Sequence, residues 1–273
     1  MNSRSLPHFE NPPVVEAVIG VQYGPINVFS NAHAGWFWKS FLGPKWDIVT
    51  EVPRLDDVFE RFGEERIFAL QPAFMIRPAG AEGDRTQITS SGSSRMIQVQ
   101  NTRFILNWKT NQTDHKYPSF ETLKSEFFAN LSKFRDFTSA SGSQEMEMNQ
   151  WEVVYVNHIP RGELWNSISE WPQVVNFFGS PASTSDGIEC DAFGGQWSLA
   201  LPEQRGRLHV SLQHGRVQNA QDGEVMVLQM TARGGIKAGD ELADCLEIGH
   251  AAIVKSFANI TTKFAHQHWK RTK

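Results

Sequence analysis

Two glutamates stand inside otherwise apolar stretches, and their type and spacing make them the first candidates for chemistry. Glu16 interrupts the run Val14–Tyr23, and Glu152 interrupts the run Trp151–Ile159. An acid in a buried strand is costly unless it is paired, faces an exposed side of the sheet, or is protonated. A close pair of such carboxylates could bind a ligand or act as a general acid and base. The alternative is two separate positions, each salt-bridged or facing solvent on a half-exposed sheet.

If the two strands are neighbours at the centre of a sheet, Glu16 and Glu152 should share one face and lie within about 10 Å of each other. Two carboxylates that close in a partly dry site would raise the pKa of at least one of them. We therefore expect a ligand site around this pair.

Several other side chains on predicted strands are candidates for ligand contacts. Those assigned to the same site as the glutamates are Asn107, Trp108, Tyr155, Asn157 and His209. Aromatic residues on the strands could also form a stacking platform for bases or a flat ligand, its members being Phe104, Trp108, Phe193 and Trp197. An aromatic stripe at strand spacing is equally what a packed core requires, so both interpretations stay open.

Local motifs for metal binding, nucleophilic catalysis and cofactor binding are missing from the sequence. None of the nine histidines forms the helical His-Glu-x-x-His pair of a metalloprotease, and His266 and His268 would point about 200° apart on a helix. There is no Gly-x-Ser-x-Gly elbow and no phosphate-binding loop, and the glycine pairs are typical of turns. The sequence therefore predicts no catalytic residue, no metal and no cofactor, with a metal site assembled from distant segments as the alternative.

Composition indicates an ordinary globular chain. Of 273 residues, 40% are hydrophobic and 21% charged, with a formal net charge of -4 that argues against non-specific binding to nucleic acid or an anionic membrane. Cys190 and Cys245 cannot form a disulfide framework. Met1–Pro12 does not resemble a secretory leader, and no apolar run approaches 18 residues. We expect a cytoplasmic protein without a membrane segment.

A hairpin followed by a helix is the best-defined part of the chain. Met96–Gln100 and Arg103–Lys109 are predicted strands, joined by the two residues Asn101 and Thr102. Ser119 is the predicted N-cap of the helix that follows. The apolar stripe of this helix recurs at three- and four-residue spacing: Phe120, Leu123, Phe127, Leu131 and Phe134.

The remaining elements are predicted from periodicity and turn residues. Further strands are expected at Val14–Tyr23, Trp46–Val52, Arg66–Leu70, Trp151–Ile159, Phe193–Leu201, Arg207–Gln213 and Glu224–Thr231. Helices are expected after Ser30, as one or two turns within Leu55–Phe62, and from an Asp240 cap through Phe264. The tract 161–190 combines helix-forming and helix-breaking residues and is left unassigned.

The order of these elements indicates an internal repeat. Strand, helix, several strands and a long helix occur twice, and Val15–Ile19 parallels Trp151–Tyr155. The alternative is coincidence plus shared helix-core patterning. We predict an α+β protein with a loose arm at 1–12 and repeats at 13–142 and 143–273, which together form a curved antiparallel sheet backed by long helices. Such a fold resembles the TATA-binding-protein saddle or the paired modules of GyrI-like ligand-binding domains.

Short motifs along the whole chain also resemble a family. They include Asn11-Pro12-Pro13-Val14-Val15-Glu16-Ala17, the hairpin pair Asn107-Trp108, Tyr117-Pro118 before the helix, Val154–Asn157, and His268-Trp269. In these the chain is similar to a sporadically distributed family of uncharacterised bacterial proteins of about this length. The resemblance implies a bacterial, single-chain protein and no established activity.

The sequence therefore favours a non-enzymatic binding protein that uses a concave sheet face or an inter-repeat cleft for a small molecule or a protein partner. A hydrolase built on the Glu16 and Glu152 carboxylates is the alternative, and nucleic-acid binding is third because of the acidic balance. A homodimer is compatible with all three.

Overall fold

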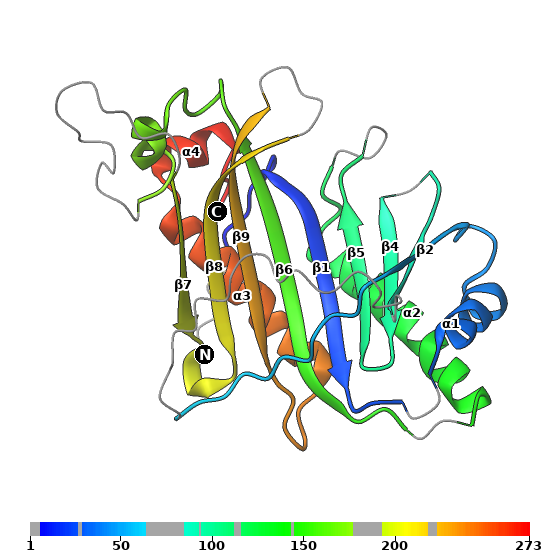
Figure 1. The fold of residues 1–273 in the computed structure, drawn as a ribbon. Helices are drawn as coiled ribbons and strands as arrows, with labels where there is room; N and C mark the ends of the chain where they lie inside the picture. Colours follow the sequence, from blue (N-terminus) through cyan, green and yellow to red (C-terminus); the bar gives the residue numbers. More distant parts are fainter. Residues whose placement is uncertain are drawn as a thin grey trace.

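One antiparallel sheet runs through the molecule (Figure 1). The computed structural model describes residues 6–26, 29–63, 85–92, 94–111, 116–142, 145–176, 193–217 and 223–273. Nine strands within these residues pair in the order β2-β3-β4-β5-β1-β6-β9-β8-β7. The prediction that the first strand of each half belongs to the same sheet is confirmed, because β1 (Val14–Tyr23) pairs with β6 (Met148–Pro160) at its centre.

The strands between β1 and β6 in the chain extend the sheet beyond β1, and the strands after β6 extend it beyond β6. On one side lie β2 (Ile48–Val52), β3 (Arg85–Thr89), β4 (Arg95–Gln100) and β5 (Arg103–Lys109), with the helices α1 (Asn31–Phe37), a π turn (Trp38–Leu42) and α2 (Phe120–Ala140). On the other side lie β7 (Gly194–Ala200), β8 (Arg207–Arg216) and β9 (Glu224–Gly235), with 3-10 turns at Ile168–Gln173 and Pro202–Gln204 and the helices α3 (Leu242–Ile260) and α4 (Lys263–His268). The predicted strands that fall within the described residues are thus present.

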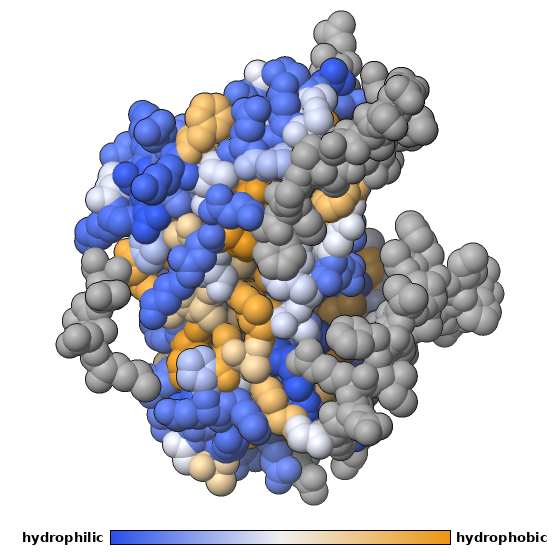
Figure 2. Space-filling model, turned by 90° about the vertical axis from the view of Figure 1, so that its left-hand side faces the viewer, coloured by the Kyte–Doolittle hydropathy of each residue, from blue (hydrophilic) through white to orange (hydrophobic). Residues whose placement is uncertain are grey.

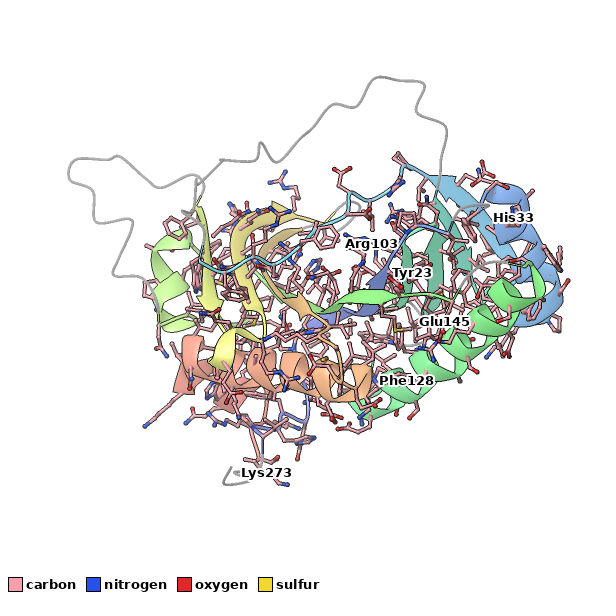
Figure 3. All side chains as sticks on the ribbon, turned by 90° about the horizontal axis from the view of Figure 1, so that it is seen from below. Tyr23, His33, Arg103, Phe128, Glu145 and Lys273 are labelled. Carbon is pink, nitrogen blue, oxygen red and sulfur yellow. The ribbon has the colours of Figure 1, made fainter. Side chains whose placement is uncertain are left out.

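The two faces of the sheet have different environments. Alternate residues of a strand point to opposite faces. Along β1, one set is apolar and buried, and it packs under α2 and α3; we call this side the helix face. The other set, Glu16, Val18, Gly20 and Gln22, points to the side that carries no long helix, which we call the open face. In Figure 3 the two long helices lie on one side of the sheet, with Phe128 and Lys273, and Arg103 lies on the other.

Aromatic packing on the helix face holds the two long helices in place. All five stripe residues of α2 predicted from the sequence are buried, and Ser119 caps this helix by accepting a hydrogen bond of 3.2 Å from the Thr122 amide. Under α3, the ring of Trp151 takes the place that a side chain on Gly249 would need, since a Cβ there would lie 2.5 Å from the ring. Helix α3 can therefore approach the sheet only because residue 249 is glycine.

The end of α3 departs from the prediction of one helix that runs from an Asp240 cap to Phe264. Asp240 caps nothing at the start of α3; its carboxylate accepts a bond from the Lys237 amide and pairs with Arg205. At the other end, Thr261 forms a β-bridge with Val175, which interrupts the helix. Thr262 then caps the separate helix α4, and Phe264 is left 51% exposed.

A second correction concerns the predicted helical turns within Leu55–Phe62. Arg54–Phe62, which we call the strap, contains no helix and crosses the open face from β2 towards β8 (Figure 1). Three of its backbone N–H groups donate to glutamine side chains of the sheet, which compete with helical hydrogen bonds for the same donors. The predictions for Arg66–Leu70 and Cys190 fall outside the described residues.

The predicted loose arm is wrong for residues 8–11. Phe9 forms a β-bridge with Arg271, and the amides of Glu10 and Asn11 donate to the carbonyls of Lys270 and Trp269, both at 3.2 Å. The Phe9 ring also packs edge-on against Phe257 of α3, with 5.3 Å between ring centroids. The arm is thus docked on the helix side of the molecule.

At the β7 end of the molecule, Figure 2 shows hydrophobic residues gathered over the middle of the face, with hydrophilic residues above and below them. The exposed apolar side chains on elements of this end include Leu199 of β7 and Phe264 of α4. Single exposed apolar residues are common on folded proteins. None of the helices in the described ranges has the length and apolar character needed to cross a membrane.

Candidate functional site

A large pocket lies on the helix face. It has a volume of about 1030 Å³ and is walled by the docked arm, the residues just before α2, the first turn of α2, the middle of α3, and the central strands β1 and β6. Pockets of this size that combine apolar walls with a few converging polar groups are the usual place for small-molecule binding. The polar groups inside it come from Tyr117, Tyr155, Asn157 and His250.

Three of these side chains form a hydrogen-bonded chain. The hydroxyls of Tyr117 and Tyr155 are 2.7 Å apart, and the Tyr155 hydroxyl lies 3.0 Å from Nδ1 of His250. The His250 ring is stacked on Phe120 of α2, with 4.0 Å between centroids and 3° between planes. This contact joins α2 to α3 and fixes the imidazole plane, so the chain of polar groups has a defined orientation.

Burial keeps all three groups uncharged near neutral pH. It raises the pKa of Tyr155 and of Tyr117 above the ordinary value of a phenol. It also lowers the pKa of His250 to about 4, and this effect exceeds the opposite influence of Glu121 and Glu247. The imidazole is therefore neutral at pH 7. A neutral imidazole beside two phenols can donate and accept hydrogen bonds without attracting an ion.

The rest of the pocket is consistent with an uncharged occupant. Asn157 is buried and donates from Nδ2 to the Leu228 carbonyl at 3.0 Å. Phe257 and Ile253 of α3 supply apolar wall, whereas the charged residues of the lining lie on exposed positions, namely Glu10, Lys116, Glu121 and Lys273. Charge is thus confined to the rim.

The open face carries a different arrangement, made of amides and charges. Arg85 donates to Gln98 at 2.8 Å, Gln98 to Asn107 at 2.8 Å, and Asn107 to Glu16 at 2.7 Å. This relay crosses four strands, and it supplies the Glu16 carboxylate with a hydrogen-bond donor. Glu16 is therefore satisfied by its neighbours on the sheet.

The strap brings a further carboxylate to this face. Glu60 accepts bonds from Arg207 Nη1 at 2.7 Å, Arg233 Nε at 2.6 Å and His209 Nε2 at 2.5 Å, and its side chain is only 5% exposed. Burial by itself would raise the pKa of Glu60. The hydrogen bonds from His209, Arg233 and Arg207 outweigh burial and lower this pKa to about 2. We call Glu60 and these three residues the Glu60 cluster.

The predicted pair of glutamates does not form a common site. Both side chains point to the open face, as expected, but Gly20 is the residue opposite Glu152, and Gly20 lies four positions from Glu16. Four residues along a strand span about 13 Å, so the expected separation of about 10 Å is wrong. Glu152 lies 3.9 Å from Arg233, whereas Glu16 is bonded to Asn107. The structure thus matches the alternative of two separately paired acids, and the carboxylate pair needed for a hydrolase is not formed.

The other predicted site residues are divided among four places. Tyr155 and Asn157 line the helix-face pocket, and His209 belongs to the Glu60 cluster. Trp108 is completely buried on the helix face, so it offers no stacking platform. Its neighbour Asn107 points to the open face. In the described part of the chain, no group of three or more His, Cys, Asp or Glu residues is placed to hold a metal.

Sequence reasoning missed Tyr117, His250 and Glu60. In the sequence, Tyr117 stands only as part of a Tyr-Pro motif before the predicted helix, and His250 belongs to no recognisable histidine motif. One signal in the sequence could have pointed to His250. It directly follows Gly249, and a glycine inside a helix can mark the place where the helix approaches the sheet closely. For Glu60 there was no local signal, because its partners lie on β8 and β9, far along the chain.

No protein-family model matches the chain, and no curated protein is significantly similar to it. The resemblance carried by Asn11–Ala17 and Asn107-Trp108 therefore stays a prediction. Function has to be argued from the geometry of the sites.

Proposed function

We propose that the chain is a non-enzymatic binding protein whose helix-face pocket takes a small, uncharged and largely apolar molecule with a hydroxyl or carbonyl group at one end. The observation that carries the proposal is the Tyr117–Tyr155–His250 chain, which lines a pocket of about 1030 Å³ and remains neutral near pH 7. A charged ligand would lose its hydration without gaining an opposite charge inside the pocket. A hydroxyl or carbonyl can instead join the chain, while aromatic or aliphatic parts contact Phe257 and Ile253.

The position of the pocket supports an origin in a duplicated fold. On either side of the β1–β6 pair the strands follow in matching order, β5-β4-β3 on one side and β9-β8-β7 on the other, and each half ends in a long helix. We infer two related halves, with the pocket at their junction, where Phe120 of one half stacks on His250 of the other.

Thermal unfolding with a set of neutral aromatic alcohols and ketones, each matched by a carboxylate of similar shape, tests the proposal. We expect some neutral compounds to raise the melting temperature, and their acids to have no effect. Tyr155→Phe keeps the ring and removes the hydroxyl, so the affinity for a stabilising compound should fall at least tenfold, whereas other contacts persist.

Tyr23→Phe is the matched control. Tyr23 is also buried, and its hydroxyl donates to the Gln100 carbonyl at 3.0 Å, but it does not line the pocket. Ligand affinity should be unchanged in this variant. Equal affinity for wild type and Tyr155→Phe, or stabilisation by the acids alone, would contradict the proposal. If the proposal holds, native mass spectrometry of protein purified from its source cell identifies the natural ligand.

A further inference from the structure

The strap is held on the open face almost entirely by side chains of the sheet. Oε1 atoms of Gln100, Gln22 and Gln150 accept bonds from the amides of Leu55, Val58 and Glu60 at 3.0, 3.0 and 3.3 Å. Gln100 also donates from Nε2 to the carbonyl of Leu55 at 3.0 Å, which makes a two-bond contact with one backbone unit.

These contacts recognise an extended backbone whatever side chains it carries. The glutamines come from β4, β1 and β6, so their spacing across the sheet is fixed by the strands. Arg103 of β5 adds a donor to the Asp56 carbonyl. Between the strap and the sheet no main-chain hydrogen bonds are formed within the described residues. A different extended segment could therefore make the same bonds without any change in strand pairing.

Side-chain recognition is concentrated in the Glu60 cluster and in one aromatic contact. The Arg207 guanidinium binds the Glu60 carboxylate and also lies 4.1 Å from the centre of the Phe62 ring. The surface therefore selects an acidic residue followed two positions later by an aromatic one. Arginine is suited to both contacts because its planar group forms directed bonds and stacks on rings.

The strap does not use every donor that the surface offers. Arg103 and Arg207 are each 9% exposed, and the Nε atom of each is buried without a hydrogen-bond partner among the described residues. Buried donors are nearly always paired in folded proteins, since an unpaired one costs about 1–3 kcal/mol. The fit between strap and surface is thus incomplete at two guanidinium groups that are central to it.

We propose that the open face is a binding site for an extended acidic segment of another protein, and that the strap occupies this site in the free chain. The side-chain amides of Gln22, Gln100 and Gln150 would bind the backbone of the incoming segment. Its acidic side chain would be bound by Arg207, Arg233 and His209. The strap is tethered, so it competes at a high effective concentration. A partner must therefore provide better contacts than the strap does, and the unpaired Nε atoms of Arg103 and Arg207 are where it can do so.

A labelled peptide with the sequence of residues 54–62 is the direct probe. Its fluorescence anisotropy is measured with wild type, with Glu60→Ala, and with Asp57→Asn. Glu60→Ala weakens the strap and leaves every surface residue intact, so the peptide should bind this variant at least tenfold more tightly than wild type. Asp57 is the matched control, because this strap carboxylate bonds to Thr102 and Arg54 outside the Glu60 cluster. The Asp57→Asn variant should bind the peptide as wild type does.

Two further peptides separate recognition from non-specific attraction. A peptide with Gln in place of Glu60 should lose at least tenfold in affinity for the Glu60→Ala chain, and one with Asn in place of Asp57 should not. Equal binding of the Glu and Gln peptides, or no binding to Glu60→Ala, would overturn the proposal.

Wild-type protein provides a readout that does not depend on a variant. With excess peptide, amide hydrogen exchange at Leu55, Val58 and Glu60 should become faster, because the strap is displaced. Unchanged protection of these amides at peptide concentrations that give full binding to wild type in the anisotropy assay would overturn the proposal. Concentration-dependent dimerisation with the same amides still protected would identify the occupant as the strap of a second copy, and would equally overturn it.

Discussion

The two faces of the sheet treat their buried polar groups in opposite ways. On the open face charged groups stand among the amides, and the chain supplies its own counter-charge by placing Glu60 among Arg207, Arg233 and His209. On the helix face the groups are neutral, and they satisfy one another along Tyr117, Tyr155 and His250 while leaving a large pocket beside them. Buried charges have to be paired within the fold, whereas a short neutral chain can be stable and still accept a ligand.

The largest effect should come from breaking the charge pairing on the open face. Glu60→Gln leaves the Arg207 guanidinium without a carboxylate and leaves Arg233 with only the more distant Glu152, and removing one partner of a buried ionic group costs roughly 3–5 kcal/mol. Chemical denaturation of wild type and variant measures this loss. Glu163→Gln is the control, since Glu163 is an exposed acid that pairs with His268, and this substitution should change stability by less than about 0.5 kcal/mol. Similar small losses in both variants would show that Glu60 is not a structural counter-charge.

Acid should affect the two faces in different pH ranges. The folded-state pKa of His250 is about 4, below its ordinary value of 6.5, so the unfolded chain binds the proton first. Stability is therefore lost as the pH falls from about 6.5 to about 4, by at most roughly 3 kcal/mol from this group. Glu60 has a lowered pKa as well, but as an acid it contributes stability above pH 4.5 that is lost only as the pH falls towards 2.

His250→Gln tests this separation of the two pH ranges. Unfolding free energies measured between pH 7 and pH 4 should depend less on pH in this variant than in wild type. Part of the slope should remain, because burial also lowers the pKa values of His158 and His266. An unchanged slope would mean that the imidazole of His250 is not kept neutral by the fold.

A smaller loss is expected when α3 is pushed away from the sheet. Gly249→Ala places a methyl group 2.5 Å from the Trp151 ring, and overpacking of this kind costs about 1–3 kcal/mol. The displacement should also move His250 away from Tyr155 and weaken ligand binding on the helix face alone. Gly35→Ala in α1 is the control, because no atom lies within 4 Å of its added Cβ. Equal stability and ligand affinity in both variants would contradict the close approach of α3.

The smallest effects should come from Glu16 and Glu152, the two glutamates of the central strands. Glu16→Gln and Glu152→Gln should each cost about 1 kcal/mol or less, because each loses one charge-assisted contact. Since the register places them about 13 Å apart, their effects should add within about 0.5 kcal/mol in the double variant. A larger coupling energy would restore the idea of a shared carboxylate site.

These examples show what the sequence could and could not determine. The two apolar runs were enough to locate β1 and β6, and treating them as neighbouring strands was enough to expect Glu16 and Glu152 on one face. The distance between them depended on the register, which is set by pairing along the whole strand and has no local signal. The strap was mistaken for helical turns because its conformation is imposed by glutamines from three distant strands. Helix α3 was predicted too long because its end is set by the bridge between Thr261 and Val175.

The helix-face pocket was predictable only in part, because some of its polar groups meet only through contacts between distant segments. Tyr155 and Asn157 could be found because they lie on a strongly patterned strand. His250 and Tyr117 both reach the Tyr155 hydroxyl only when α2 and α3 pack side by side and Phe120 meets the imidazole. Such contacts between segments far apart in the sequence leave no spacing pattern that a single sequence can reveal.

The docking of residues 8–11 against residues 269–272 has a consequence for biosynthesis. A ribosome adds roughly 5–20 residues per second, so residues 8–11 wait for tens of seconds before their partners are made. During that time the wall of the pocket formed by Phe9 and its neighbours lacks its main-chain partners. This wall is therefore complete only on molecules whose synthesis has passed residue 272.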